Sequence, residues 1–300
     1  MTKKLFDVVI LTDDRYVAPK KINWYIENIL EEDRLLQSAL ENHGLKVGRK
    51  SWSDPKFDWS KTKQVIFRST WDYFDRIEDW QDWLKRTNEV THMINPFPLI
   101  EWNMDKHYLA DLRQKGINIP DTAYLEKGSK RTLTEIFDQK GWHTCMLKPC
   151  ISAAARLTFK IDRENLLEHE EIFQRHIRHE AFMLQPFQTN ITKLGEVSFM
   201  VMGGQFTHAV LKRAKAGDFR VQDDFGGTVH PYHASEEEIA FAEKAIAACE
   251  PKPLYARVDV FRDNNGELAV IELEMIEPEL WFRMKPEAAE VLAKAIVDYS

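Results

Sequence analysis

The 300-residue chain contains few cysteines and glycines, 3 and 12 respectively. Cys145, Cys150 and Cys249 are odd in number and lack the paired spacing of a zinc site, so neither a disulfide framework nor a cysteine metal site is indicated. Reduced thiols in a cytoplasmic protein are the simplest interpretation. The Walker A pattern and the Rossmann glycine fingerprint, two common nucleotide-binding motifs, are also absent.

Long apolar runs are absent as well. The first one, Leu5–Leu11, is far too short to cross a bilayer, is not a signal peptide, and predicts a buried strand. The net charge of −7 argues against a broad surface for nucleic acid or anionic membrane. Hydrophobic residues make up 44% and charged residues 30% of the chain, which is the balance of a globular protein. We therefore expect a cytoplasmic protein with no nucleic-acid partner and no membrane partner.

The first third of the chain alternates strand and helix signals. Apolar runs predict strands at 5–11, 45–47 and 64–68, and helical spacing predicts helices at 33–43 and 78–90. This order indicates an α/β domain with a partly parallel sheet. The sequence Asn95-Pro-Phe-Pro98 interrupts the pattern, so we place the end of an N-terminal, substrate-side domain (residues 1–98) there.

The rest of the chain shows hairpin signals between amphipathic segments. The strongest are Gly203-Gly204 between 197–202 and 205–213, and Asp263-Asn-Asn-Gly266 between 256–262 and 268–274. Further strands are predicted at 122–125, 144–148 and 181–187, and helices at 105–115, 133–140, 164–176, 235–248 and 287–299. Such a pattern predicts antiparallel sheet over much of this part of the chain.

Two lysines stand out as candidate phosphate ligands. Lys106 lies at a predicted helix start, and Lys148 ends the apolar run Cys145-Met-Leu147. An ammonium group is a compact charge suited to phosphate oxygens. A charge at the end of a buried strand is costly unless it has a partner, so Lys148 is the stronger candidate.

Three acidic residues lie in the predicted C-terminal hairpin. Glu272 and Glu274 are two residues apart on one strand and so face the same side, and Asp259 on the preceding strand can lie opposite them. Three like charges on one face repel unless a cation neutralises them, and an all-oxygen set suits Mg²⁺. A solvated edge strand produces the same alternation, and spacing alone does not separate the two interpretations.

Two weaker patterns also carry charge. The basic segment 212–220, followed by Phe225-Gly-Gly227, offers planar arginine donors beside glycines, which suits phosphate or carboxylate. Arg68 and Asp72 follow a predicted strand at 65–67, at the end of a strand where α/β sheets bind ligands. We expect these two residues to contact substrate, although a salt-bridged turn beside a packed Trp71 explains them equally well.

Taken in order, these motifs resemble the ATP-grasp superfamily. The resemblance covers roughly Asn95 to Leu280 and rests on nine ordered pieces, among them Leu147-Lys148-Pro149, Leu184-Gln185-Pro186-Phe187, Gly195-Glu196-Val-Ser198, Arg257-Val-Asp259 and Glu272-Leu-Glu274. Ile151-Ser-Ala, Arg68-Ser-Thr-Trp-Asp72-Tyr73 and Ile276-Glu-Pro278 look closest to the branch that contains the cycloserine-biosynthesis ligase. The chain is also similar, more distantly, to glutathione synthetases and ribosomal-protein glutamate ligases.

The resemblance implies an ATP-dependent ligase that joins a carboxylate to an amine through an acyl-phosphate. In that family an α/β domain precedes two α+β subdomains with mainly antiparallel sheets, which grip ATP between them. By this resemblance the linker and first subdomain would span 99–187, and the second subdomain, with the Mg²⁺ site, would span 188–300. The implied roles are ATP binding by Lys106, Lys148, Ser152, Gln185, Phe187 and Glu196; catalysis by Lys212, Arg220 and Arg257; and binding of Mg²⁺, with Mn²⁺ as an alternative, by Asp259, Glu272 and Glu274. The implied substrate is a small amino-acid-like molecule, and the oligomers common among relatives leave room for a homo-oligomer.

One segment departs from the family pattern. Many relatives carry a glycine-rich loop over the phosphates after the second lysine, whereas residues 150–158 contain no glycine. Ser152 and Arg156 remain able to contact phosphate, but alanines restrict the backbone. This departure motivates an alternative, an ATP-binding module without catalysis. A second alternative is a ligase that modifies a protein or peptide tail.

Overall fold

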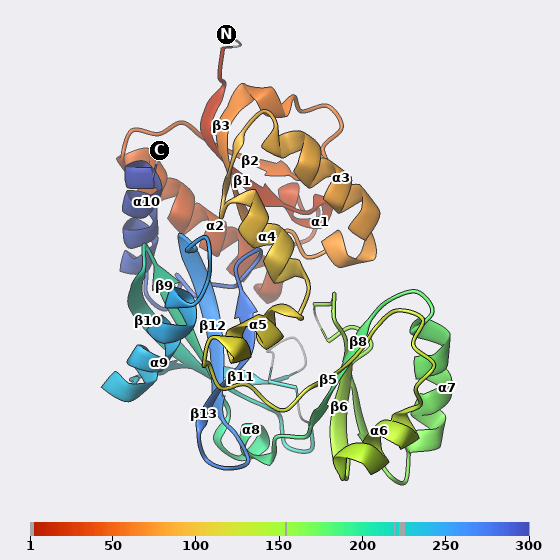
Figure 1. Ribbon diagram of the computed structural model, residues 1–300. Helices are drawn as coiled ribbons and strands as arrows, with labels where there is room; N and C mark the ends of the chain where they lie inside the picture. Colours follow the sequence, from red (N-terminus) through yellow and green to blue (C-terminus); the bar gives the residue numbers. More distant parts are fainter. Residues whose placement is uncertain (1–2, 154, 219, 222–225, 300) are drawn as a thin grey trace.

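The computed structural model describes residues 3–153, 155–218, 220–221 and 226–299. Its strands form three separate sheets, each built from its own stretch of the chain (Figure 1). The N-terminal sheet is covered by helices, and the middle and C-terminal sheets face each other below it in Figure 1. This is the predicted order of an α/β unit followed by two α+β units.

The N-terminal sheet has the order β2-β1-β3-β4, and all its strands are parallel rather than only some of them. Its strands are β1 (Phe6–Thr12), β2 (Val47–Ser51), β3 (Thr62–Ser69) and β4 (His92–Ile94). The helices are α1 (Asp14–Val17), α2 (Trp24–Asn42) and α3 (Ile77–Asn88), with short 3-10 turns at Trp59–Lys61 and Tyr73–Asp75. Helix α2 begins well before the predicted Asp33, because the Asn23 side chain accepts a hydrogen bond from the Ile26 amide and caps it.

The segment that was predicted to break the chain begins a helix instead. Helix α4 (Phe97–Met104) starts after Pro96, and Pro98 lies in its first turn. Proline is tolerated there because the first amides of a helix have no partner within the helix. Helix α5 (Tyr108–Gln114) follows directly and places Lys106 in the short connection between the two helices.

The middle sheet has the order β5-β8-β6-β7 and is entirely antiparallel. Its strands are β5 (Ala123–Leu125), β6 (Thr144–Pro149), β7 (Phe159–Asp162) and β8 (Phe182–Pro186). Helices α6 (Leu133–Lys140) and α7 (Leu166–His176) cover one face and bury an apolar cluster that comes only from residues 123–184. A complete capping box, formed by Thr132 and Glu135, fixes the start of α6.

The C-terminal sheet has the order β11-β10-β9-β12-β13 and is also antiparallel. Its strands are β9 (Glu196–Met202), β10 (Gln205–Arg213), β11 (Thr228–Tyr232), β12 (Tyr255–Arg262) and β13 (Leu268–Glu274). Both predicted hairpins are present. Helix α9 (Glu236–Ala247) begins with the expected capping box at Ser235 and Glu238, and the unpredicted α8 (Thr189–Leu194) precedes β9.

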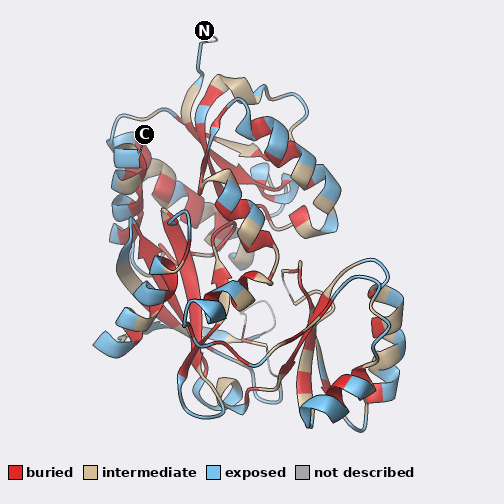
Figure 2. Cartoon of the chain, viewed as in Figure 1, coloured by how far each residue is buried: buried red, intermediate tan, exposed pale blue. Residues whose placement is uncertain are grey.

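The N-terminal and C-terminal sheets share one core. Helix α10 (Glu287–Tyr299) packs against α2, and an apolar cluster joins residues of β1, β3, β9, β10 and α10 (Figure 2). The buried Asn95 amide adds a polar link, because its Nδ2 donates to the carbonyls of Tyr255 and Met275, each at 2.9 Å. The boundaries at 98 and 187 stay predictions. Within the described residues, no helix is both long enough and apolar enough to cross a membrane.

Candidate active site

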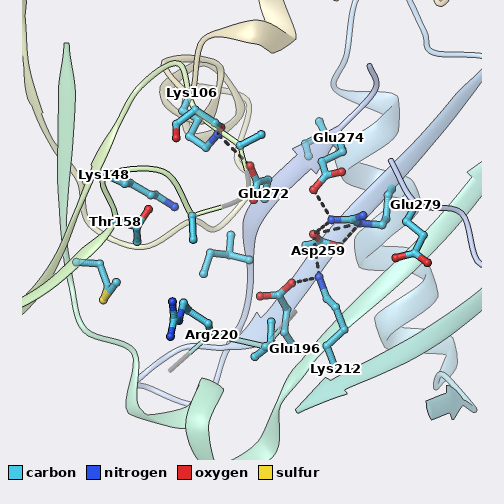
Figure 3. Close-up of a pocket in the computed structure, with 18 of the residues that line it drawn as sticks. Lys106, Lys148, Thr158, Glu196, Lys212, Arg220, Asp259, Glu272, Glu274 and Glu279 are labelled. Carbon is cyan, nitrogen blue, oxygen red and sulfur yellow. Dashed lines mark hydrogen bonds and ion pairs between the residues drawn. The ribbon is translucent and has the colours of Figure 1, made fainter. Parts of the chain in front are cut away.

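A cavity of about 290 Å³ lies where the middle sheet, the C-terminal sheet and the N-terminal unit meet (Figure 3). Most of the residues singled out in the sequence line it. They are Lys106, Lys148, Ser152, Gln185, Phe187, Glu196, Lys212, Arg220, Arg257, Asp259, Glu272 and Glu274. The fold therefore brings together residues that are more than 150 positions apart in the sequence, although their individual roles stay predictions.

The two candidate phosphate-binding lysines differ in their partners. The Lys106 ammonium donates to the Ser152 carbonyl at 2.6 Å and pairs with Glu272 at 3.0 Å. The Lys148 ammonium, on β6, has no hydrogen bond or ion pair with any described residue. Burial lowers the pKa of Lys148 despite the opposing charge of Glu272. Lys148 thus presents a buried positive charge to the cavity and is available to an anionic ligand.

The three candidate metal ligands form one cluster of carboxylates. Asp259 on β12 pairs in register with Glu272 on β13, and one oxygen from each of Asp259, Glu272 and Glu274 lies within 4.8 Å of the others (Figure 3). The alternation of β13 puts Glu272 and Glu274 on one face, as the spacing predicted. A set of hard oxygen donors suits Mg²⁺, so the residues present fit the ion that the motif implied.

The ionisation of this cluster is set by burial and by neighbouring cations. Burial alone would raise the pKa of Asp259, but the charges of Arg257 and Lys212 outweigh it and hold that pKa well below its usual value. The pKa of Glu272 is likewise lowered, by Lys106 and Lys148 against the effect of burial. Burial raises the pKa of Glu274 well above its usual value, because Arg257 compensates only in part. A cation bound among these oxygens would supply the missing positive charge.

Two candidate catalytic cations are held in the same network. Arg257 makes two short contacts with Asp259, from Nε at 2.9 Å and from Nη2 at 2.8 Å, and also pairs with Glu274. Lys212 on β10 pairs with Glu196 and lies 3.2 Å from Asp259. Glu196, which the resemblance placed among the ATP-binding residues, is therefore paired with Lys212 in this structure.

The loop after Lys148 adopts unusual backbone angles without any glycine. Ala155 and Leu157 have positive φ values of 55° and 49°, a left-handed conformation that costs roughly 1–2 kcal/mol per non-glycine residue. The Arg156 guanidinium donates to the Glu180 carboxylate, from Nη1 at 2.7 Å and from Nη2 at 2.8 Å, so in this structure it is not available for phosphate. Ala154 lies outside the described residues.

Two of the expected ATP-binding residues, Gln185 and Phe187, lie at or just beyond the end of β8. The buried Gln185 donates to the Thr122 hydroxyl at 3.0 Å, and the Lys160 ammonium lies 4.3 Å above the Phe187 ring. On the other side of the cavity, Arg220 pairs with Asp218 at 2.7 Å. Phe219 and Phe225 of the basic segment lie outside the described residues.

Arg68 and Asp72 are not among the cavity-lining residues. Arg68 is buried and donates to the Pro278 carbonyl at 2.8 Å, with the Glu32 carboxylate 3.7 Å away. Asp72 accepts a hydrogen bond from the Trp52 indole at 2.7 Å and pairs with Arg76. This placement agrees with the salt-bridged turn, and it does not support the expected substrate contact.

Other residues line the cavity without having been predicted to do so. These residues are Tyr25, Glu277 and Trp281, together with Trp71 and Tyr73 from the turn after β3. The sequence offered a signal for three of them, since Trp71, Tyr73 and Glu277 lie within the motifs Arg68-Ser-Thr-Trp-Asp72-Tyr73 and Ile276-Glu-Pro278. Tyr25 comes from the start of α2, in the part of that helix that was not predicted.

Comparison with known families agrees with this architecture. Residues 8–95 match the N-terminal domain of the D-cycloserine synthetase DcsG, and residues 111–290 match the RimK-like ATP-grasp domain. The cycloserine biosynthesis protein DcsG of Streptomyces lavendulae is 28% identical to the chain over 284 residues, covering 88% of this chain and 92% of the relative.

Solved structures give the same picture of the fold. The crystal structure of the D-cycloserine synthetase DcsG superposes with a TM-score of 0.86 at 24% identity, covering 97% of this chain and 99% of that one. The D-alanine–D-alanine ligase of Bacillus anthracis, solved with ATP, gives a TM-score of 0.63 at 12% identity and covers 97% and 96%. The ligase PsnB, solved with a precursor peptide, gives 0.60 at 16% identity and covers 99% and 98%.

Proposed function

Because the chain belongs to the RimK-like ATP-grasp family and is an ATP-dependent ligase that forms a carbon–nitrogen bond, we propose that its substrate is a small amino-acid-like molecule. The observation that carries this proposal is that the two candidate phosphate-binding lysines and the carboxylate cluster line one cavity. The likeness to DcsG over most of the chain favours ring closure within one substrate molecule as the form of the reaction.

The proposed reaction has two steps. A substrate carboxylate oxygen attacks the γ-phosphorus of ATP, so that ADP leaves and an acyl-phosphate forms. A neutral nitrogen then attacks the acyl carbon, inorganic phosphate leaves with the bonding electron pair, and the nitrogen loses a proton. Both steps concentrate negative charge on phosphate oxygens, so catalysis depends on positioned cations.

The cationic side chains divide this work by position. Lys106 and Lys148, on the side of the middle sheet, hold the ATP phosphates, and for Lys106 this requires release of its contact with Glu272. Lys212 and Arg257, on the C-terminal sheet, lie where they stabilise charge on the transferred group. Asp259, Glu272 and Glu274 would hold Mg²⁺, which supplies neutralisation of the phosphate charge when bound.

A direct test measures ADP release in a coupled assay with Mg-ATP and a panel of D- and L-amino acids and their O-substituted derivatives. Wild type is compared with Glu272→Gln, which removes one cluster carboxylate, and with Glu267→Gln, an exposed change in the same hairpin. We expect the first variant to lose about 100-fold or more in rate and the second to keep full activity.

The same panel distinguishes the alternatives. Mass spectrometry identifies a cyclised product because its mass is that of the substrate minus one water. An intermolecular amide instead has the summed mass of its two components minus one water. If only a peptide or protein carboxylate supports ADP release, the small-molecule proposal is wrong. If Mg-ATP binds but nothing in the panel or in a peptide set supports turnover, a non-catalytic module is the correct description.

A further inference from the structure

The charged groups that line the cavity are almost all paired with one another. The pairs are Lys106 with Glu272, Lys212 with Glu196, Arg257 with Asp259 and Glu274, Arg220 with Asp218, and Glu279 with Arg283. Across the part of the chain that the structure describes, two groups in this lining have no ion pair, the ammonium of Lys148 and the carboxyl of Glu277. The proposed function already assigns an anion to Lys148, whereas Glu277 has no assigned partner.

Glu277 is held in place without a cation. The Tyr73 hydroxyl is close enough to its carboxyl group to lower the pKa of that group, and its backbone carbonyl accepts a hydrogen bond from the Trp71 indole at 3.0 Å. The residue is only 8% exposed, so water cannot fully solvate a negative charge there. Consistent with this, burial raises the pKa of Glu277 to about 7, against the opposing effects of Tyr73 and Lys106.

The segment that carries Glu277 is anchored on its far side by buried groups. Arg68 donates to the Pro278 carbonyl at 2.8 Å, and the Glu32 carboxylate accepts the backbone amides of Phe282 and Arg283, each at 3.1 Å. These contacts fix the backbone of the segment that follows Glu277. The backbone that carries Glu277 is therefore held in place before any ligand arrives, which favours preorganisation of a recognition site.

The wall around Glu277 is aromatic. Tyr25, Trp71 and Tyr73 line the same cavity, and the Tyr25 and Trp71 rings pack with their centroids 6.1 Å apart. Aromatic faces attract cations, and a buried carboxylate gains most from a cation that also donates hydrogen bonds. A primary ammonium group has both properties, because it carries one positive charge and three donors.

We infer that Glu277 binds the ammonium group of an amino-acid-like substrate, with Tyr73 orienting the carboxylate and Tyr25 and Trp71 flanking the cation. This inference rests on the proposed function and names the substrate class more closely, as a compound with a free primary amine. A carboxylate partner stabilises the protonated amine, and a protonated amine cannot attack an acyl carbon. The ammonium held at Glu277 is therefore a spectator, and the attacking nitrogen is a second one in the same substrate or in a co-substrate.

The test compares free amines with their N-acetylated forms in the ADP-release assay. The compounds are D- and L-serine derivatives, D- and L-alanine, and D-cycloserine as an inhibitor, each paired with its N-acetyl form. For wild type we expect activity or inhibition from free amines only. Glu277→Gln keeps the size of the side chain and removes the charge. We expect it to raise the KM or Ki of the active amine about 10- to 100-fold, while the KM of Mg-ATP changes less than about twofold.

Two further variants separate recognition from folding. Tyr73→Phe removes only the hydroxyl group that orients Glu277, and we expect a smaller rise in the KM of the amine with little change in kcat. Glu101→Gln, an exposed change on α4, serves as the matched control and should leave both KM values unchanged. Thermal stabilisation by Mg-ATP in every variant confirms that the nucleotide side of the site is intact.

Three outcomes overturn the inference. The first is an N-acetylated compound that acts as well as its free amine, and the second is an unchanged KM for the amine in both Glu277→Gln and Tyr73→Phe. The third is a free-amine panel without any effect on a wild type that binds Mg-ATP. A wild type that fails to bind Mg-ATP overturns the proposed function, and this inference with it.

Discussion

Lys148, whose ammonium has no ion pair among the residues that the structure describes, leads to a prediction about stability as well as ligand binding. The pKa of Lys148 is lowered by burial, so the native protein binds fewer protons at this site than the unfolded chain does, and the charged form destabilises the free protein at neutral pH. Replacing Lys148 with methionine keeps the apolar stem and removes the charge. We expect Lys148→Met to unfold at a higher temperature than wild type when no nucleotide is present.

The order of stability should reverse when Mg-ATP is added. For wild type at about 100 times the dissociation constant, ligand binding stabilises the native state by about 2.7 kcal/mol. For a chain of 300 residues, an unfolding entropy of ~2.1 cal/mol/K per residue converts this to an upward shift of about 4 °C. Lys148→Met loses the charge that faces the phosphates, so its shift should be less than about 1 °C at the same nucleotide concentration.

Differential scanning fluorimetry of wild type, Lys148→Met and Lys127→Met, each with and without Mg-ATP, measures all of these values. Lys127 is exposed on the same unit of the chain, so its replacement should leave both the melting temperature and the nucleotide shift as in wild type. The reasoning is refuted if Lys148→Met keeps the full shift. It is also refuted if this variant is less stable than wild type in the absence of nucleotide, because the buried charge would then have a stabilising partner.

Other perturbations give equally direct results. Burial alone would lower the pKa of His107, but Asp105 and Glu126 outweigh this effect, so the pKa is raised. The stabilisation that protonated His107 contributes is therefore complete below the unfolded-state pKa of about 6.5, and it is lost as the pH rises through the folded-state pKa. Melting curves should therefore separate wild type from His107→Gln more at pH 5.5 than at pH 9, and an equal gap at both would contradict this. Gly195 has φ 91°, and an added Cβ would lie 2.5 Å from the Lys212 carbonyl, so Gly195→Ala should lower stability by roughly 1–3 kcal/mol in urea titrations. The three cysteine thiols, of Cys145, Cys150 and Cys249, are buried and have raised pKa values. They should not react with an aromatic disulfide reagent at pH 8 until denaturant is added, and a reaction before that point would show that the core is open.

The part of the site that could be predicted depends on local periodicity. Glu272 and Glu274 were placed on one face because strand side chains alternate, and Asp259 was placed opposite because a hairpin turn separates the two strands. The charge on Lys148 was noticeable because it ended an apolar run. These patterns need only a few neighbouring residues, so a single sequence contains enough information to recognise them.

The predictions from sequence failed where the position or contacts of a residue depend on segments far away in the chain. Arg68 lies near the end of the buried strand β3, a position that usually indicates a ligand-binding edge, but the segment 278–283 and α2 cover that edge and neutralise its charge. The surroundings of Glu277 are set in part by Trp71 and Tyr73, which lie some 200 positions earlier in the chain. Helix α4 was missed because prolines suggest a break, although they are equally compatible with a first helical turn.

The shared core between the N-terminal and C-terminal sheets has a consequence for motion. Helix α10, helix α2 and Asn95 tie these two sheets into one body, whereas the middle sheet has an apolar core of its own. A rotation of the middle sheet would separate mainly the contacts that Cys150 and Met183 make with the neighbouring cluster. Admission and release of nucleotide should therefore proceed by rotation of the middle sheet, while the substrate wall stays fixed to the carboxylate cluster throughout the cycle.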